Sequence, residues 1–199
     1  MPPPVLHCNI FFGRQSRVAG RQAFETAQTG RKKPVMPEIF PTPGHDHDRC
    51  AADAIAQAEQ VCARKGQRLT PMRRRVLEIL AASHKPLGAY EIIDAVADSG
   101  PRPAPITVYR ALDFLMANGL AHRIASRNAF LACGHKHANG ALVAFLICES
   151  CGSVGEMQSG DLAAALAAAA NSAGFAPAMS VVEITGFCTY CARSRAESR

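Results

Sequence analysis

Two Cys-x-x-Cys pairs constrain the fold of this chain more than any other feature of its sequence. Cys148 and Cys151 form the first pair, and Cys188 and Cys191 form the second. Each pair lies at or just beyond the end of a predicted strand. If those strands are neighbours in one sheet, the four thiolates converge on one point. Four thiolates with no open position describe a structural zinc site.

Other chemistries of paired cysteines fit less well. A thioredoxin-like couple needs a single pair that opens a helix, and this does not account for two pairs. An iron–sulfur cluster also takes four thiolates, and the sequence leaves that alternative open. The first residues lack the apolar stretch and cleavage site of a signal peptide. We therefore expect a cytoplasmic protein, in which paired cysteines favour metal over disulfides.

The middle of the chain has the pattern of a winged helix. Residues 51–134 contain four amphipathic helical segments, followed by two short apolar runs that flank a Ser-Arg-Asn turn and indicate a hairpin. The predicted helices span residues 51–66, 69–83, 88–100 and 106–119, and the hairpin spans residues 120–133. In such a domain the last helix enters the DNA major groove and the hairpin is the wing.

A small α/β unit follows over residues 142–192. Strand patterns at 142–148, 153–157 and 178–188 surround an alanine-rich helical segment at 161–174. A unit this small is rarely stable alone, and a structural metal with dimerisation is a common remedy. The predicted fold class is therefore α+β, with an N-terminal winged-helix DNA-binding domain and a small α/β dimerisation domain that holds a structural zinc.

The remaining segments are predicted to be irregular. Residues 1–50 are rich in Gly, Pro and polar residues and indicate a disordered extension. Residues 135–141 are a linker and residues 193–199 a tail. His45, His47 and Cys50 lie in the extension; they could bind zinc weakly, but we interpret them as part of a solvated tail.

A second set of metal-binding side chains spans both predicted domains. His122 and Cys133 fall on the wing, Glu156 falls in the α/β unit, and His135 and His137 lie in the linker. Nitrogen, sulfur and oxygen donors in one set suit zinc better than iron or manganese. The alternative is a polar linker with incidental histidines.

Charge points to a polyanion as partner of the middle segment. The chain carries a net charge of +6, and residues 51–135 hold eleven Lys or Arg against seven Asp or Glu. Such a basic region suits DNA, although a merely solvated surface would look the same. We find no apolar run of the roughly 20 residues that a membrane helix needs. Nucleophile–base pairs and phosphate-binding glycine loops are also missing, so we expect no enzyme activity.

With these motifs in view, the chain resembles the ferric uptake regulator family, and within it the zinc uptake regulator branch. The resemblance covers about residues 51–192 and rests on RLTPMRRRVLEIL, GAYEIID, TVYRALDFLMANGLAHRI, FLICESCGSVGEM and GFCTYC. It implies a homodimeric, metal-sensing repressor that binds palindromic double-stranded operators when its sensing site is filled. One structural and one regulatory zinc ion per chain are implied.

The resemblance also assigns residues. It places the structural zinc on Cys148, Cys151, Cys188 and Cys191, and the regulatory zinc on His122, Cys133, Glu156 and one further histidine. An ungapped count puts that histidine on Ala141, so the ligand shifts to His135 or His137. The base-contacting pair of the zinc branch matches Tyr90 and Arg110. We add Thr107, Tyr109, Arg73 and Arg74 as expected DNA contacts, the arginines through phosphate.

Two rivals remain at this point. An iron or peroxide sensor of the same family would place its His-x-His motif closer to Cys148 than His137 lies, and would carry a late histidine that this chain lacks. A zinc-storage or zinc-donor protein would use the same ligands without specific DNA binding.

Overall fold

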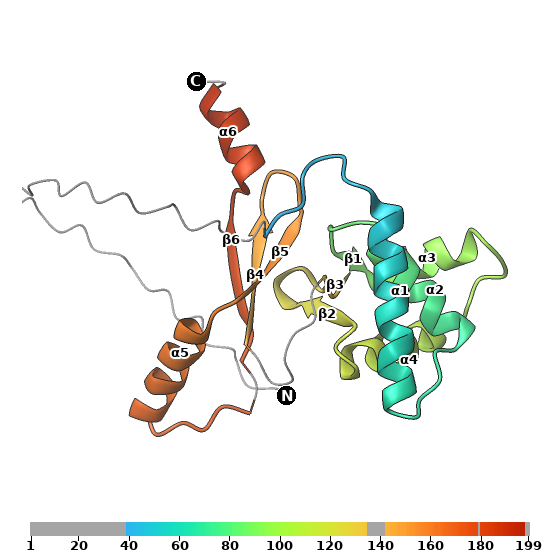
Figure 1. Ribbon diagram of the computed structural model, residues 1–199, viewed down its shortest axis with the longest axis horizontal. Coiled ribbons are helices and arrows are strands. Elements are labelled where there is room, and N and C mark those ends of the chain that lie inside the picture. The colour runs from blue at the N-terminus through green and yellow to red at the C-terminus, as the bar shows by residue number, and fades with distance from the viewer. Residues whose placement is uncertain (1–38, 135–141, 179, 198–199) are drawn as a thin grey trace, which may run out of the picture. The chain divides into compact units, whose positions relative to one another are not determined.

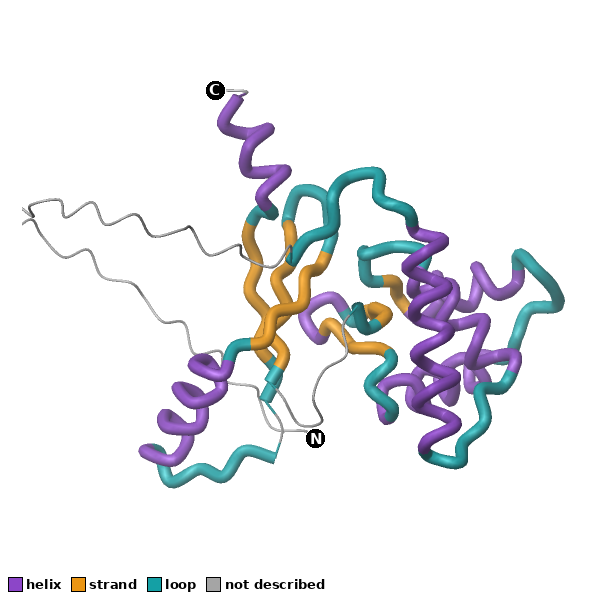
Figure 2. Tube along the Cα trace, in the orientation of Figure 1, coloured by secondary structure: helices purple, strands orange, loops and turns teal. Residues whose placement is uncertain are grey.

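The computed structural model describes residues 39–134, 142–178 and 180–197 of the chain. Two three-stranded sheets organise these residues (Figure 1). The first sheet belongs to an N-terminal part that is mostly helical, and the second belongs to a C-terminal part with two further helices (Figure 2). Both parts match the predicted α+β class.

The helices of the N-terminal part begin where the sequence supplies a cap. The Asp46 carboxylate accepts hydrogen bonds from the backbone N–H groups of Asp48 and Arg49 at the start of α1. Thr70 caps α2 in the same way, and Pro71 occupies its first helical position, where a missing N–H costs nothing. The helices are α1 (His47–Arg64), α2 (Pro71–Ala81), α3 (Ala89–Ala97) and α4 (Pro105–Ala117).

One apolar core holds these helices together. The inward-facing apolar side chains of α2, α3 and α4 meet in it, and eight of them are at most 1% exposed: Val76, Leu77, Leu80, Ile92, Ile93, Val108, Leu112 and Leu115. Each such side chain contributes about 1.5–3 kcal/mol by leaving water. The core therefore fixes the orientation of α4, whose opposite face stays in solvent.

The wing follows α4 as predicted. Strands β2 (Ala121–Ile124) and β3 (Ala129–Ala132) pair antiparallel, with a short 3-10 turn at Ala125–Arg127 between them. Asn128 closes the turn with φ at +46°, a left-handed conformation that asparagine tolerates better than most residues. A two-residue strand, β1 (Leu87–Gly88), pairs with β3 and completes the sheet in the order β1-β3-β2.

The C-terminal part is built on a sheet of order β5-β4-β6. Strand β4 (Val143–Cys148) pairs antiparallel with β5 (Val154–Gln158) and parallel with β6 (Val182–Gly186). Helix α5 (Gly160–Ser172) forms the crossover to β6, and α6 (Thr189–Glu197) follows the last strand. The parallel pairing aligns the carboxyl ends of β4 and β6, where the two cysteine pairs lie.

This sheet shares its small core with the wing. Phe145, Ile147 and Val154 cluster with Ile124 and Leu131 of the wing strands, whereas α5 has no buried residue. In this chain alone, the C-terminal part thus buries few side chains of its own, as its size predicts.

The structure differs from the expectation near both ends. Helix α1 begins at His47 rather than Ala51, because Asp46 caps it, and residues 39–50 have defined contacts where disorder was predicted. Helix α6 extends through Glu197, where an irregular tail was predicted from residue 193. Residues 1–38 and the linker 135–141 lie outside the described residues. No described helix is long and apolar enough to cross a membrane.

Candidate metal centres and DNA-facing helix

The four cysteines of the two Cys-x-x-Cys pairs come together as predicted. Cys148 ends β4 and Cys151 lies in the turn to β5, while Cys188 follows β6 and Cys191 lies in the first turn of α6. Their sulfur atoms all lie within 4.8 Å of one another. The neighbouring β4 and β6 strands cause this convergence, because Cys148 pairs with Gly186, two residues before Cys188.

Backbone N–H groups prepare the Cys148 sulfur for metal. The N–H of Cys188 points at it from 3.4 Å. Burial raises the pKa of this thiol, but N–H donors from Cys151, Cys188 and Ser150 outweigh burial and lower the pKa to about 6. A thiolate already present at neutral pH is the form that binds zinc. The closed set of four sulfurs leaves no ligand position for catalysis.

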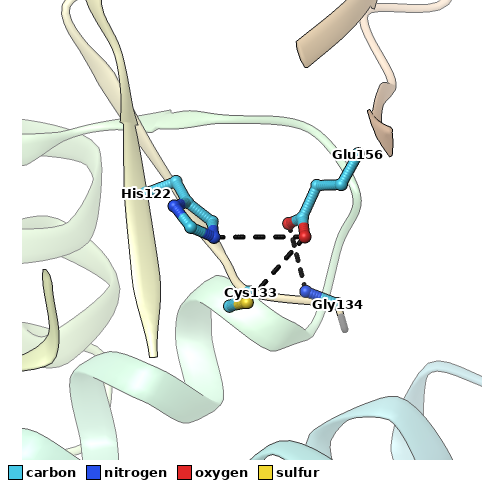
Figure 3. Close-up of polar contacts among 4 residues, drawn as sticks. All are labelled: His122, Cys133, Gly134 and Glu156. Carbon is cyan, nitrogen blue, oxygen red and sulfur yellow. Dashed lines mark hydrogen bonds and ion pairs between the residues drawn. The ribbon is translucent and has the colours of Figure 1, made fainter. Parts of the chain in front are cut away.

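The second predicted set also converges, and Figure 3 shows three of its members. Glu156 on β5 points toward the wing, where one carboxylate oxygen lies 3.8 Å from Cys133 Sγ and 4.0 Å from His122 Nε2. Ligand atoms around one tetrahedral zinc ion lie about 3.3–3.8 Å apart, given Zn–N and Zn–O bonds near 2.0 Å and Zn–S near 2.3 Å. The three side chains therefore need only a small contraction to share an ion.

The side chains of this set are mostly buried, and they have both an apolar and a polar neighbour. The Glu156 side chain is 4% exposed and the His122 side chain 20% exposed. The His122 ring packs against Phe145 at 5.1 Å between centroids. The backbone N–H of Gly134 donates to the other Glu156 oxygen at 3.1 Å, which orients the carboxylate.

The two candidate fourth ligands lie in a part of the chain that the structure does not describe. His135 and His137 both lie outside the described residues, directly after Gly134. The position of Gly134 beside Glu156 brings the chain to the site at that point.

The expected DNA contacts lie on an exposed face. On α4, Thr107 and Arg110 are exposed and Tyr109 is 39% exposed, while Val108 between them is fully buried. Tyr90, the second residue of α3, is 68% exposed. Neither tyrosine side chain is therefore part of the helical core.

The two α2 arginines have partners within the protein. Arg73 donates to the Arg68 carbonyl at 2.6 Å and stacks 3.4 Å above the Phe114 ring. Arg74 forms an ion pair with Glu59 of α1. Both side chains remain at the surface. To contact a DNA phosphate, each would have to share or leave its partner within the protein.

Sequence reasoning missed two contacts. His84, in the loop after α2, meets His45 and His47, which were interpreted as a solvated tail. Glu183 on β6 accepts hydrogen bonds from the backbone N–H groups of Ala125 and Ser126 at the wing tip, at 2.6 and 3.1 Å. Both contacts join residues more than 35 positions apart, so no local pattern could reveal them.

Together, the helical bundle with its wing and the convergent ligand sets define a winged-helix protein organised around metal ions. The chain belongs to the ferric uptake regulator family, whose pattern matches residues 64–185. Among its relatives, the zinc uptake regulation protein of Escherichia coli is 34% identical over 139 residues, which cover 70% of this chain and 81% of that protein. The peroxide operon regulator of Bacillus subtilis is 29% identical over 72% of this chain and 97% of that protein.

Solved structures agree with the fold. A zinc uptake regulator in complex with zinc and DNA superposes with a TM-score of 0.69 at 34% identity, covering 73% of this chain and 97% of that one. The holo form of the regulator XcZur superposes with a TM-score of 0.65 at 43% identity, covering 72% of this chain and 99% of that one.

Proposed function

We propose that this protein is a zinc-responsive, homodimeric repressor that binds operator DNA and controls zinc-uptake genes in the cytoplasm. The observation that carries the proposal is the set of His122, Cys133 and Glu156, because it joins the wing to the dimerisation sheet. Its relatives named for zinc uptake support zinc as the signal. A regulator of this kind has no catalytic step.

Zinc acts here through geometry. His122 and Cys133 belong to the wing sheet and Glu156 belongs to β5, so an ion bound by all three holds the two sheets at one angle. In a dimer this angle sets the distance between the two α4 helices, which must match successive major-groove half-sites. Moving a population from about 1:99 to 99:1 needs about 5.5 kcal/mol of differential binding. Structural zinc sites reach about 10–16 kcal/mol, so a zinc ion can supply this.

Homodimerisation is supported by apolar side chains that the C-terminal part leaves in solvent. Phe175, Val181 and Ile184 are 64%, 50% and 47% exposed, and Leu166 and Phe187 are also exposed. Several large apolar side chains left exposed on one small α/β unit fit an interface between two copies, because dimerisation would remove them from water.

The decisive test is operator affinity against buffered free zinc for wild type and Cys133→Ser. We expect Cys133→Ser to stay folded and to keep the four-cysteine zinc, but to lose zinc-dependent operator binding. Cys62→Ala is the matched control, because Cys62 is buried in α1 far from either ligand set, and it should respond like wild type. A normal zinc response in Cys133→Ser would overturn the proposed switch.

The same experiment separates the rivals. If purified protein holds iron at the second site, or if iron rather than zinc drives operator binding, the protein is an iron or peroxide sensor. If zinc binds fully but affinity is equal for operator and random DNA at every zinc level, the protein stores or donates zinc instead.

A further inference from the structure

Three histidines outside both ligand sets converge at the start of the helical bundle. His45 directly precedes the Asp46 cap, His47 is the first residue of α1, and His84 lies in the loop between α2 and β1. One ring nitrogen from each lies within 4.8 Å of the other two. His45 and His84 are half-buried, whereas His47 is exposed.

The hydrogen bonds of His45 already orient it as a metal ligand. Its Nδ1 lies 3.1 Å from the Thr42 carbonyl oxygen, to which it can only donate. In the neutral ring this leaves the lone pair on Nε2, which faces His84 Nε2 at 2.8 Å. Metal-ligating histidines commonly donate their second N–H to a carbonyl in this way.

A metal ion can replace the proton between these two rings. Two imidazole nitrogens on one tetrahedral zinc lie about 3.3 Å apart, given Zn–N bonds of about 2.0–2.1 Å. The His45 and His84 nitrogens must therefore separate by only about half an ångström, and His84 must move its proton to Nδ1. His47 then supplies a third nitrogen from the first turn of α1.

A fourth donor stands next to the histidines. Cys50 Sγ lies 3.9 Å from His84 Nε2. Cys50 is three residues after His47 on α1, so both side chains lie on one face of the helix. Three imidazoles and a thiolate form a tetrahedral donor set that suits zinc.

The cluster borders cavities that it shares with both predicted zinc sites. A cavity of about 200 Å³ is lined by the three histidines and also by Cys151, Cys188 and Cys191. A second cavity of about 210 Å³ is lined by His45, Cys50 and His84 together with Glu156.

The histidine loop also contacts the dimerisation sheet directly. The His84 carbonyl oxygen accepts a hydrogen bond from the N–H of Val154, the first residue of β5, at 2.9 Å. The segment before His45 crosses the same strand, because Ile39 lies so close to Gly155 that a Cβ there would meet its side chain at 2.6 Å.

We propose that His45, His47 and His84, with Cys50 as fourth ligand, form a further zinc site that ties the start of α1 to the loop contacting β5. This ion is additional to the structural and regulatory ions. It fixes the first helix of the DNA-binding domain against the dimerisation sheet.

The test is the number of zinc ions bound per full-length chain, measured by native mass spectrometry during titration with buffered zinc. We expect His84→Gln and His47→Gln each to bind one zinc ion fewer than wild type. His47 is exposed on the first turn of α1, so its replacement cannot remove an ion merely by unfolding the core. His122→Ala is the comparison variant and should lose the regulatory zinc ion. The double variant of His122→Ala and His84→Gln should therefore bind two zinc ions fewer than wild type.

Cobalt substitution identifies the donors. The thiolate-to-cobalt absorption of the cobalt-loaded protein should decrease in Cys50→Ser. In the double variant of Cys50→Ser and Cys133→Ser, the decrease should equal the sum of the decreases in the two single variants. Wild-type zinc stoichiometry in both His47→Gln and His84→Gln would overturn the proposal. Neither measurement uses DNA. A negative result for the histidine site would therefore not contradict zinc-dependent operator binding, and a failure of operator binding would not contradict the histidine site.

Discussion

At the scale of single residues, we propose that Arg110, an exposed side chain of α4, reads DNA sequence. It lies on the exposed face of α4, one residue before the centre of the helix (Pro105–Ala117), and Val108 and Leu112 on the opposite face anchor the helix in the core. The N-terminal turns of a recognition helix are the part that reaches base edges. Arginine can also donate two hydrogen bonds to one guanine.

We therefore expect Arg110→Ala to weaken operator binding by about 1–3 kcal/mol, with a smaller loss on random DNA. Fluorescence anisotropy with both DNAs at fixed zinc and fixed salt measures the difference. Arg193→Ala, which removes the same charge from exposed α6, should leave the operator preference unchanged. Equal losses on both DNAs would instead assign Arg110 to a phosphate.

At the scale of elements, Glu183 connects the wing to the C-terminal sheet by hydrogen bonds that are separate from the candidate metal ligands. Burial raises the pKa of the Glu183 carboxyl, but hydrogen bonds from the Ser126 hydroxyl and from the N–H groups of Ser126 and Ala125 outweigh it and lower the pKa. The ionised carboxylate is therefore stabilised in the folded state. Its contribution is present above the ordinary glutamate pKa of about 4.3 and is lost as pH falls through the lowered value.

Glu183→Gln should accordingly lower the free energy of unfolding at pH 7 by about 1 kcal/mol. This value is small for hydrogen bonds to a charged group, because solvent reaches the site and screens the charge. Urea unfolding at several pH values measures this, and the difference from wild type should shrink below about pH 4. Glu197→Gln changes the same charge at the exposed end of α6 and serves as the control. A difference that persists unchanged in acid would exclude the carboxylate as its source.

At the scale of the whole molecule, the four cysteines bring together the carboxyl ends of β4 and β6, two neighbouring strands of the C-terminal sheet. Cys148 and Cys151 come from the β4–β5 turn, and Cys188 and Cys191 from the β6–α6 connection, so one ion closes a loop that contains α5. Since this sheet shares its small core with the wing, we propose that a zinc ion on these cysteines supplies folding energy that the core lacks.

Cys188→Ser should lose the tightly held zinc, melt at a lower temperature and elute as a monomer. Metal analysis after gel filtration, light scattering and thermal unfolding together measure these changes. Cys62→Ala should retain zinc and the dimer, even if loss of its buried sulfur lowers the melting temperature slightly. A dimeric Cys188→Ser protein with full zinc content would contradict a structural role for the site.

The elements that local pattern specifies were predictable from the sequence. The apolar stripes of α2, α3 and α4, the Ser-Arg-Asn turn of the wing and the strands around α5 all lie within a few residues of their predicted positions. The geometry within each Cys-x-x-Cys pair was predictable for the same reason, because each pair lies within four residues of chain. The meeting of the two pairs depends instead on the pairing of β4 with β6.

Tertiary structure alone decided which distant side chains meet. Cys133 and Glu156 are 23 residues apart, and His45 and His84 are 39 apart; spacing along the chain says nothing about either distance. The local sequence around a histidine in a Gly- and Pro-rich segment does not distinguish a solvated side chain from one that packs against a loop. Asp46 starts α1 four residues earlier than expected, and this places His47 and Cys50 on an ordered helix beside His84. Packing of α1 on the bundle, rather than any motif, brought these side chains together.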